Sequence, residues 1–142
     1  MPKIRLVPAR SPQAAAIPYR LRPDGGLEVL LVTSSSGRWM APKGWIEPGR
    51  TAAEAATLEA LEEAGAIGRI VEPELGRFTD INADGAPREV RVFALAVDRV
   101  LDHWQEESTR RRRWMTVEEA TEAVCKHGLA GLLEKLSERL KP

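Results

Sequence analysis

The hydrophobic positions of this chain fall into short strand-like runs that surround one helical block. Residues 14–19 and 27–32 are nearly unbroken apolar segments, which is typical of strands covered on both faces. The sequence Arg-Pro-Asp-Gly-Gly at 22–26 separates them and predicts a hairpin turn. A short apolar pair, Trp39-Met40, follows, and the Pro- and Gly-rich residues 41–50 predict a loop.

Residues 51–65 carry the strongest helix signals in the chain. Thr51 and Glu54 have the spacing of a capping box, in which each side chain accepts a hydrogen bond from the other residue's backbone amide. The interior is rich in alanine, and Gly65 stands where a left-handed residue ends a helix. The segment therefore predicts a helix between Thr51 and Gly65.

The remaining pattern predicts an alternating α/β domain. Strands are expected at 70–78 and 89–97, joined by the turn sequence Asn-Ala-Asp-Gly at 82–85, and at 112–115. A second capping box at Thr116 and Glu119 opens a helix that runs to about residue 126, and an amphipathic helix covers 129–140. We expect two or three helices around a mixed sheet, in one domain (1–142) with its core at about 12–140.

Composition narrows the classes of function. A chain of 142 residues with 21 basic and 21 acidic side chains has no net charge, which argues against a nucleic-acid partner held by phosphate charge. One cysteine and two histidines exclude a disulfide framework and a Cys- or His-rich metal centre, so carboxylates remain as ligands. An apolar run of about 20 residues and a signal-type segment are both lacking, so we expect a cytoplasmic protein without a membrane partner. Its oligomeric state is left open.

Three glutamates supply the candidate chemistry. Glu59, Glu62 and Glu63 have i, i+3, i+4 spacing and therefore share one helix face. Taken alone, this pattern is more typical of a solvated acidic face. The glycine-bearing loop at 42–49 leads directly into the helix, however, and its backbone carbonyls could join the carboxylates around a hard cation. Such an oxygen donor set suits Mg²⁺ or Mn²⁺.

Residues 44–66 resemble the Nudix box, the loop–helix signature of the Nudix hydrolases. The matching positions are Gly44, Glu59, Glu62, Glu63 and Gly65, with Ala60 and Ala66 at the aliphatic places. Two positions depart from the family pattern, because Arg50 replaces its first Glu and Leu58 replaces the Arg before its first helical Glu. The resemblance implies a Nudix α/β/α sandwich with a mixed central sheet and a loop–helix catalytic motif.

The resemblance also implies a reaction, which is hydrolysis of a phosphoanhydride bond with Mg²⁺ or Mn²⁺ as cofactor. Glu59 and Glu63 would be the principal metal ligands, completed by Glu62 and the Gly44 carbonyl. The general base would be one of these glutamates or Glu106 from a later loop; an exposed loop acid is the alternative for Glu106. We also expect Arg50 to reach toward the glutamate face and partly replace the missing arginine, with a solvated Arg50 as the alternative.

Further segments resemble the branch of diphosphoinositol polyphosphate and diadenosine polyphosphate hydrolases. These segments are 14–19, 29–36, 38–39, 42–44 and 113–114. The branch implies a small phosphorylated substrate, either a diphosphoinositol polyphosphate or a dinucleoside polyphosphate, with ADP-ribose and nucleoside triphosphates still open. The candidate substrate-binding residues are Arg10, Arg20, Ser34, Ser35, Ser36, Arg38, Lys43 and Arg88.

Two alternatives accompany this interpretation. The arginine run at 110–113 could bind phosphate, although an acid-paired surface is the commoner meaning of such a run. The loss of the box Glu and Arg could instead mark a Nudix-fold nucleotide sensor with little turnover. A purely structural domain with a soluble acidic helix is a third possibility.

Overall fold

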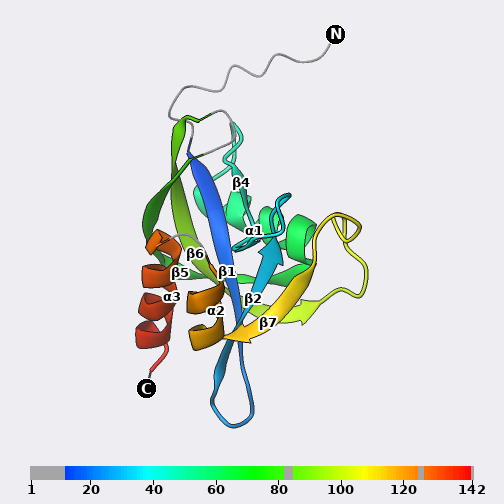
Figure 1. Cartoon of the computed structure of the whole chain (residues 1–142), viewed down its shortest axis with the longest axis vertical. Helices are drawn as coiled ribbons and strands as arrows, with labels where there is room; N and C mark the ends of the chain where they lie inside the picture. The colour runs from blue at the N-terminus through cyan, green and yellow to red at the C-terminus, as the bar shows by residue number, and fades with distance from the viewer. Residues whose placement is uncertain (1–11, 82–84, 125–126, 142) are drawn as a thin grey trace.

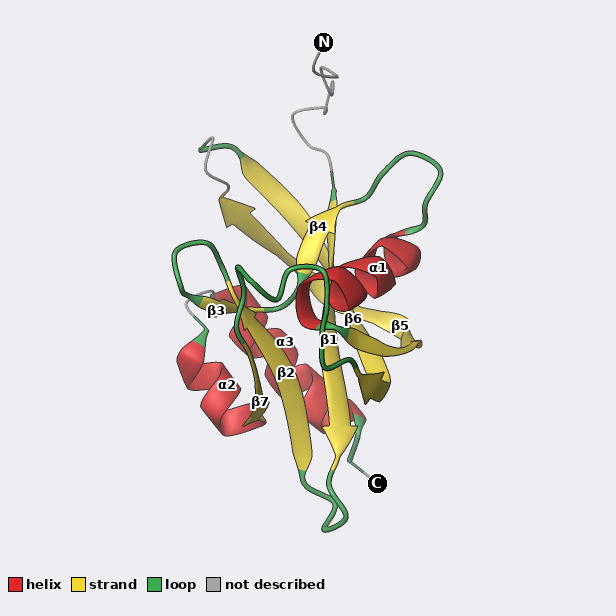
Figure 2. Ribbon diagram, turned by 90° about the vertical axis from the view of Figure 1, so that its right-hand side faces the viewer, coloured by secondary structure: helices red, strands yellow, loops and turns green. Residues whose placement is uncertain are grey.

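The computed structural model describes residues 12–81, 85–124 and 127–141. In these ranges a seven-stranded mixed sheet lies between α1 on one face and α2 and α3 on the other (Figure 1 and Figure 2). This arrangement confirms the predicted α/β sandwich. The strands are β1 (Gln13–Leu21), β2 (Leu27–Thr33), β3 (Trp39–Met40), β4 (Lys43–Trp45), β5 (Ala66–Ile81), β6 (Pro87–Val100) and β7 (Arg112–Thr116), and the helices are α1 (Ala52–Ala64), α2 (Val117–Ala123) and α3 (His127–Arg139).

Strand β1 organises the sheet because three other strands pair with it. It runs parallel to β6 and antiparallel to β2 and to β4. The main strand order is β3-β2-β1-β6-β5, with β4 added to β1 and β7 added to β2. The two short strands β3 and β4 thereby bring the chain from the edge of the sheet back to its centre, directly before α1.

Alternating side chains of β1 fill two separate cores. Ala14 and Ala16 are buried against α1, whereas Ile17 is buried in the cluster that includes Leu133 of α3. Successive strand residues point to opposite faces, so a strand covered on both sides reads as an unbroken apolar run. The first two predicted strands are therefore confirmed as buried central strands.

Helix α1 begins and ends at the predicted residues. The Thr51 hydroxyl accepts a hydrogen bond from the Glu54 amide at 3.1 Å, and a Glu54 carboxylate oxygen accepts one from the Thr51 amide at 2.8 Å. Gly65 ends the helix in the left-handed conformation, with φ at +64°. The second predicted capping box, at Thr116, is also present and opens α2.

Tertiary pairing changes several predicted boundaries. The predicted loop at 41–50 contains β4, because Lys43–Trp45 pairs with the distant residues Gln13, Ala14 and Ala15. Strands β5 and β6 extend beyond the predicted 70–78 and 89–97. Helix α2 ends at Ala123 rather than near 126, since Val124 is extended and bridges Trp39. Residues 82–84 of the predicted turn lie outside the described residues.

The segment between β6 and β7 covers the C-terminal end of α1 (Figure 1). The carbonyls of Glu62 and Gly65 accept hydrogen bonds from the amides of Glu106 and Leu101, at 3.1 and 2.8 Å. The Ala64 carbonyl accepts one from the Arg112 guanidinium at 2.9 Å. These contacts satisfy terminal helix carbonyls and place a cation at the negative end of the helix dipole. None of the helices in the described ranges is long and apolar enough to cross a bilayer.

Replacing Gly65 by alanine tests this junction. A Cβ at Gly65 would lie 2.8 Å from an Arg112 nitrogen and 2.9 Å from the Trp104 Cβ, in addition to the strain of positive φ. We expect Gly65→Ala to lower the free energy of unfolding by more than the ~1–2 kcal/mol of left-handed strain alone, measured by urea denaturation. Gly25→Ala is the matched control, because Gly25 has φ +87° with nothing within 4 Å. Equal losses of unfolding free energy in Gly65→Ala and Gly25→Ala would contradict close packing around Gly65.

Candidate active site

Helix α1 places Glu59 and Glu63 one turn apart, beneath β4 and the segment that precedes β7. Glu63 is buried, with 4% of its surface exposed. One of its carboxylate oxygens accepts a hydrogen bond from the Lys43 amide at 3.1 Å, and the other accepts one from the Arg110 guanidinium at 3.5 Å. Both oxygens are therefore held by donors from outside the helix.

Burial disfavours the ionised forms of these two carboxyls. Burial raises the pKa of Glu63 to about 8, and neighbouring Glu59 adds to the rise, while the Arg110 charge and the Lys43 amide oppose it. Burial also raises the pKa of Glu59, which shares a hydrogen bond with Glu63. Two adjacent carboxylates can both ionise readily only when a cation compensates their charge.

Strand β4 approaches Glu59 more closely than any side chain would allow. A Cβ at Gly44 would overlap the Glu59 carboxylate. Glycine at this position therefore lets the backbone lie directly beside the acid. This close approach gives a physical reason for the glycine that begins the box, and it places main-chain polar groups next to the carboxylates.

The other two predicted catalytic acids border the same place. The charges of Glu62 and Glu106 both act on Glu59 and help to raise its pKa, after the larger effect of burial. Glu106 also accepts a hydrogen bond from the Arg110 Nε at 2.7 Å. The structure therefore brings together all four predicted catalytic acids, Glu59, Glu62, Glu63 and Glu106.

This donor set fits a hard divalent cation. Within the described residues, no three His, Cys, Asp or Glu side chains already converge as a complete metal-binding group, and Glu63 instead uses protein donors. The available ligands are all oxygens, Gly44 lets the backbone lie directly beside Glu59, and a compensating charge would favour the ionised forms of the two carboxyls. Glu59 and Glu63 would hold Mg²⁺ or Mn²⁺, with Glu62 and the Gly44 backbone as further donors.

The residues around this cation would have different roles in the reaction. A bound divalent ion supplies charge that polarises a phosphate and lowers the pKa of water. The side chain of Glu106 keeps 28% exposure and that of Glu62 is half-buried, so either can take a proton from an approaching water molecule. The arrangement can thus support attack of water on a phosphorus atom.

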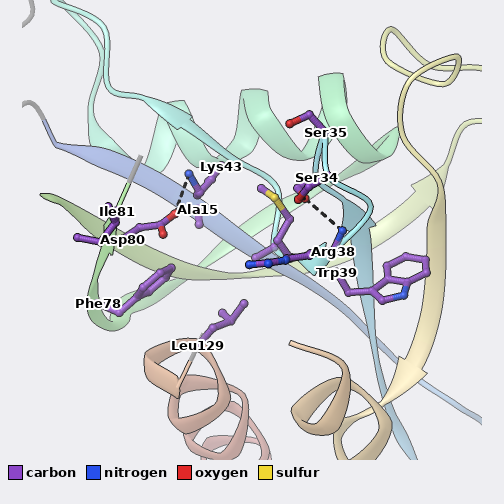
Figure 3. Close-up of a pocket in the computed structure, with 13 residues that line it drawn as sticks. Ala15, Ser34, Ser35, Arg38, Trp39, Lys43, Phe78, Asp80, Ile81 and Leu129 are labelled. Carbon is purple, nitrogen blue, oxygen red and sulfur yellow. Dashed lines mark hydrogen bonds and ion pairs between the residues drawn. The ribbon is translucent and has the colours of Figure 1, made fainter. Parts of the chain in front are cut away.

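A pocket of about 330 Å³ lies beside β4 (Figure 3). Five of the predicted substrate-binding residues line it, namely Ser34, Ser35, Ser36, Arg38 and Lys43. The other walls include Trp39, Met40, Phe78, Asp80, Ile81 and Leu129. The pocket therefore combines hydroxyl groups and cations on one part of its surface with aromatic and aliphatic walls on another.

Lys43 joins the pocket to the acidic cluster. Its amide donates to Glu63, and its ammonium group lies 3.1 Å from an Asp80 carboxylate oxygen and 3.4 Å from the Gln13 side-chain oxygen. Figure 3 shows the Lys43 and Asp80 side chains meeting at the pocket wall. The sequence did not indicate Gln13 or Asp80, because they lie next to the Lys43 ammonium group only once the sheet has formed.

The serine-rich turn presents its hydroxyls at the pocket edge. The Ser34 amide donates to the Arg38 carbonyl at 2.7 Å, and the Gly37 amide donates to the Ser34 carbonyl at 2.9 Å. The Ser34 and Ser36 hydroxyls lie 3.0 Å apart. Since Ser35, Ser36 and Arg38 are exposed, their polar groups are available to an anionic ligand.

Two of the described residues predicted to bind substrate, Arg20 and Arg88, do not line this pocket. Arg20 pairs with Glu28 at 2.9 Å and stacks 4.0 Å from the centre of the Trp114 ring. Arg88 is buried, with its guanidinium 5.3 Å from the centre of the Trp45 ring, and it does not line the pocket. Arg10 lies outside the described residues.

The expectation for Arg50 is wrong. Arg50 lines a separate surface hollow with Glu54, Leu58 and Leu61, and the structure records no ion pair between Arg50 and the three box glutamates. Arg50 is exposed and precedes the first residue of α1, which agrees with the alternative of a solvated side chain. The arginine that contacts Glu63 is Arg110.

The acid-paired interpretation of the arginine run is confirmed for two of its members. Arg110 contacts Glu63 and Glu106, and Arg113 lies 3.5 Å from Glu119. The i, i+4 spacing of Glu106 and Arg110 was a signal that could have predicted their pairing.

Comparison with known proteins identifies the family. The NUDIX domain profile matches residues 10–136. The chain is 38% identical over 132 residues to Nudix hydrolase 18, mitochondrial, of Arabidopsis thaliana, covering 87% of this chain and 74% of that protein. It is 37% identical over 117 residues to mouse diphosphoinositol polyphosphate phosphohydrolase 3-alpha, covering 77% and 68%. The chain therefore belongs to the Nudix hydrolase family.

The fold agrees with this assignment. The crystal structure of a Caenorhabditis elegans Ap4A hydrolase binary complex superposes with a TM-score of 0.77 at 26% identity, covering 92% of this chain and 97% of that chain. Together with the mouse relative, it confirms the predicted branch of the family. The Nudix domain of Shewanella oneidensis NrtR, complexed with ADP ribose, shares the fold at a TM-score of 0.72 and 18% identity, covering 93% of this chain and 89% of that one.

The raised pKa of Glu63 predicts an unusual pH dependence of stability without divalent ions. The folded protein keeps the Glu63 proton up to about pH 8, whereas an ordinary glutamate in the unfolded chain loses it near pH 4.5. The free energy of unfolding should therefore fall between these pH values, with a limiting slope of about 1.4 kcal/mol per pH unit. Urea denaturation in EDTA measures it. Glu63→Gln removes this contribution, and parallel pH curves for the two proteins would contradict the raised pKa of Glu63.

The free energy by which added Mn²⁺ stabilises the wild-type protein should increase with pH.

Gly44→Ala tests the close approach of β4 to Glu59. The added methyl group must displace the Glu59 carboxylate, so we expect Mn²⁺ affinity to fall about 10- to 100-fold, measured by electron paramagnetic resonance titration. Gly131→Ala is the control, because Gly131 is helical and a Cβ there meets nothing within 4 Å. Unchanged Mn²⁺ binding in Gly44→Ala would remove Gly44 from the site.

Proposed function

We propose that this protein hydrolyses a phosphoanhydride bond in a small phosphorylated substrate, with Mg²⁺ or Mn²⁺ as cofactor. The observation that carries this proposal is the contact of Lys43 with both halves of the site, since its amide holds Glu63 and its side chain lines the pocket. A substrate held in the pocket would therefore present its phosphates beside the acidic cluster.

The walls of the pocket favour a dinucleoside polyphosphate over a diphosphoinositol polyphosphate. Arg38 and Lys43 are its two lining cations, and Asp80 offsets one of them. Trp39 and Phe78 supply aromatic surface that suits a nucleobase. A diphosphoinositol polyphosphate carries phosphates around its whole ring and would need more cations than the described walls provide. The Ap4A hydrolase named above supports the first substrate, and the mouse relative supports the second.

A nucleotide sensor with little turnover is the second candidate. The observation in its favour is the replacement of the box Glu and Arg by Arg50 and Leu58. Against it stand the four neighbouring acids, since a binding module has no need of so many carboxylates at one place. The two candidates differ in turnover and not in ligand binding.

A substrate panel tests the proposal. Purified protein is incubated with diadenosine tetraphosphate, a diphosphoinositol polyphosphate, ADP-ribose and ATP, each with Mg²⁺, Mn²⁺ or EDTA, and product release is measured. We expect metal-dependent hydrolysis, fastest with diadenosine tetraphosphate, and a loss of at least about 100-fold in kcat for Glu63→Gln. Glu134→Gln, on the exposed side of α3, is the matched control and should retain full activity. Tight binding without turnover would favour the sensor, and full activity in Glu63→Gln would refute the site.

The cytoplasmic location expected from the sequence stays a proposal. The Arabidopsis relative is named as a mitochondrial protein, so the two compartments are direct alternatives. A fluorescent fusion of the full chain would distinguish them.

A further inference from the structure

Arg110 contacts Glu63 and Glu106 although it lies outside the box sequence at 44–66. The family box would place an arginine at position 58, where this chain has leucine, and Leu58 lies by the surface hollow away from the glutamates. We infer that Arg110 is the positioning residue for Glu63 and Glu106, an inference that rests on the proposed hydrolase function. It acts from the segment before β7 and not from α1.

The guanidinium group of Arg110 reaches three acceptors at once. Its Nε donates to Glu106 at 2.7 Å, one terminal nitrogen donates to the Thr33 carbonyl at 2.8 Å, and the other lies 3.5 Å from a Glu63 oxygen. A planar group with donors in a fixed fork can fix the relative positions of three acceptors, whereas a lysine ammonium on a flexible stem fixes them less strictly. The side chain has 20% exposure, which limits competition from water.

The Thr33 contact anchors this arginine to the sheet. Thr33 is buried at the end of β2, and its hydroxyl accepts a hydrogen bond from the Arg111 amide at 2.9 Å. The Thr33 amide in turn donates to the Arg111 carbonyl at 3.0 Å. The backbone next to Arg110 is therefore held by a central strand, so the guanidinium is placed by rigid structure and not by the acids that it contacts.

Glu63 is thereby held from two sides. The Lys43 amide binds one of its oxygens from β4, and Arg110 faces the other oxygen. Holding both oxygens sets the rotation of the carboxylate plane, which determines where the acid directs its lone pairs. The same arginine fixes the distance between Glu63 and Glu106, the two acids contributed by different elements.

Orientation and charge make opposite predictions for metal binding. If Arg110 orients Glu63, its removal should weaken the binding of a divalent cation, because contacts of this kind typically contribute 10- to 100-fold in metal affinity or activity. If Arg110 acted only through its charge, its removal would strengthen cation binding, since a positive charge beside the carboxylates opposes the cation. The sign of the change in cation affinity therefore distinguishes orientation of Glu63 from an effect of charge alone.

The experiment compares Arg110→Gln and Arg110→Lys with wild type. Mn²⁺ dissociation constants are measured without substrate by electron paramagnetic resonance titration, and kcat and KM are measured with diadenosine tetraphosphate and Mg²⁺. For Arg110→Gln we expect Mn²⁺ affinity and kcat each to fall about 10- to 100-fold, with KM changed by less than about threefold. Arg110→Lys keeps the charge without the fork and should recover only part of both losses. Arg113→Gln, which removes an exposed arginine paired with Glu119, is the matched control.

Each contrary result has a definite meaning. Tighter or unchanged Mn²⁺ binding in Arg110→Gln would overturn the inference, as would full recovery by Arg110→Lys. A rise in KM with normal kcat would make Arg110 a substrate contact instead. Circular dichroism melting identifies unfolded variants, and Arg110→Lys, which keeps the positive charge, keeps the test valid if Arg110→Gln does not fold. If wild type hydrolyses nothing, the proposed function fails while the Mn²⁺ titration still decides the role of Arg110.

Discussion

The site depends on the antiparallel pairing of three residues, Lys43–Trp45, with the start of β1. This pairing places the Lys43 amide on the buried carboxylate of Glu63 and presses Gly44 against Glu59. Without β4 the α1 glutamates would form an ordinary acidic helix face. With it, Glu63 is buried and Glu59 is half-buried beside a backbone segment, where burial raises the pKa of each carboxyl and a nearby cation would favour their ionised forms.

The segment that precedes β7 completes the site from the other side. It satisfies the terminal carbonyls of α1 and delivers Glu106 and Arg110 to the box glutamates. Stability and chemistry are therefore joined in one stretch of chain, since the contacts that end the helix also set the distance between Glu63 and Glu106. A chain that has lost the Glu and Arg of the box can keep an ordered acidic cluster because this order comes from elsewhere in the fold.

Local sequence was sufficient for the elements whose structure is decided by neighbours in the chain. Both capping boxes and the left-handed Gly65 are confirmed, because each depends on residues within one helical turn. Local sequence did not predict the surroundings of the Arg50, Arg20 and Arg88 side chains. A charged side chain can point toward any acid or aromatic ring that folding brings near it, and resemblance to a family does not show which partner that will be.

The sequence by itself determined the α/β class and the helix that carries the glutamates, since periodicity and capping are readable along the chain, and its resemblance to the Nudix box indicated the family. Only the tertiary structure decided that β4 is a strand, that Lys43 meets Asp80 and Glu63, and that Arg110 holds Glu63. These contacts join residues 20 to 47 positions apart, and their geometry depends on how the sheet orders its strands and not on any local pattern.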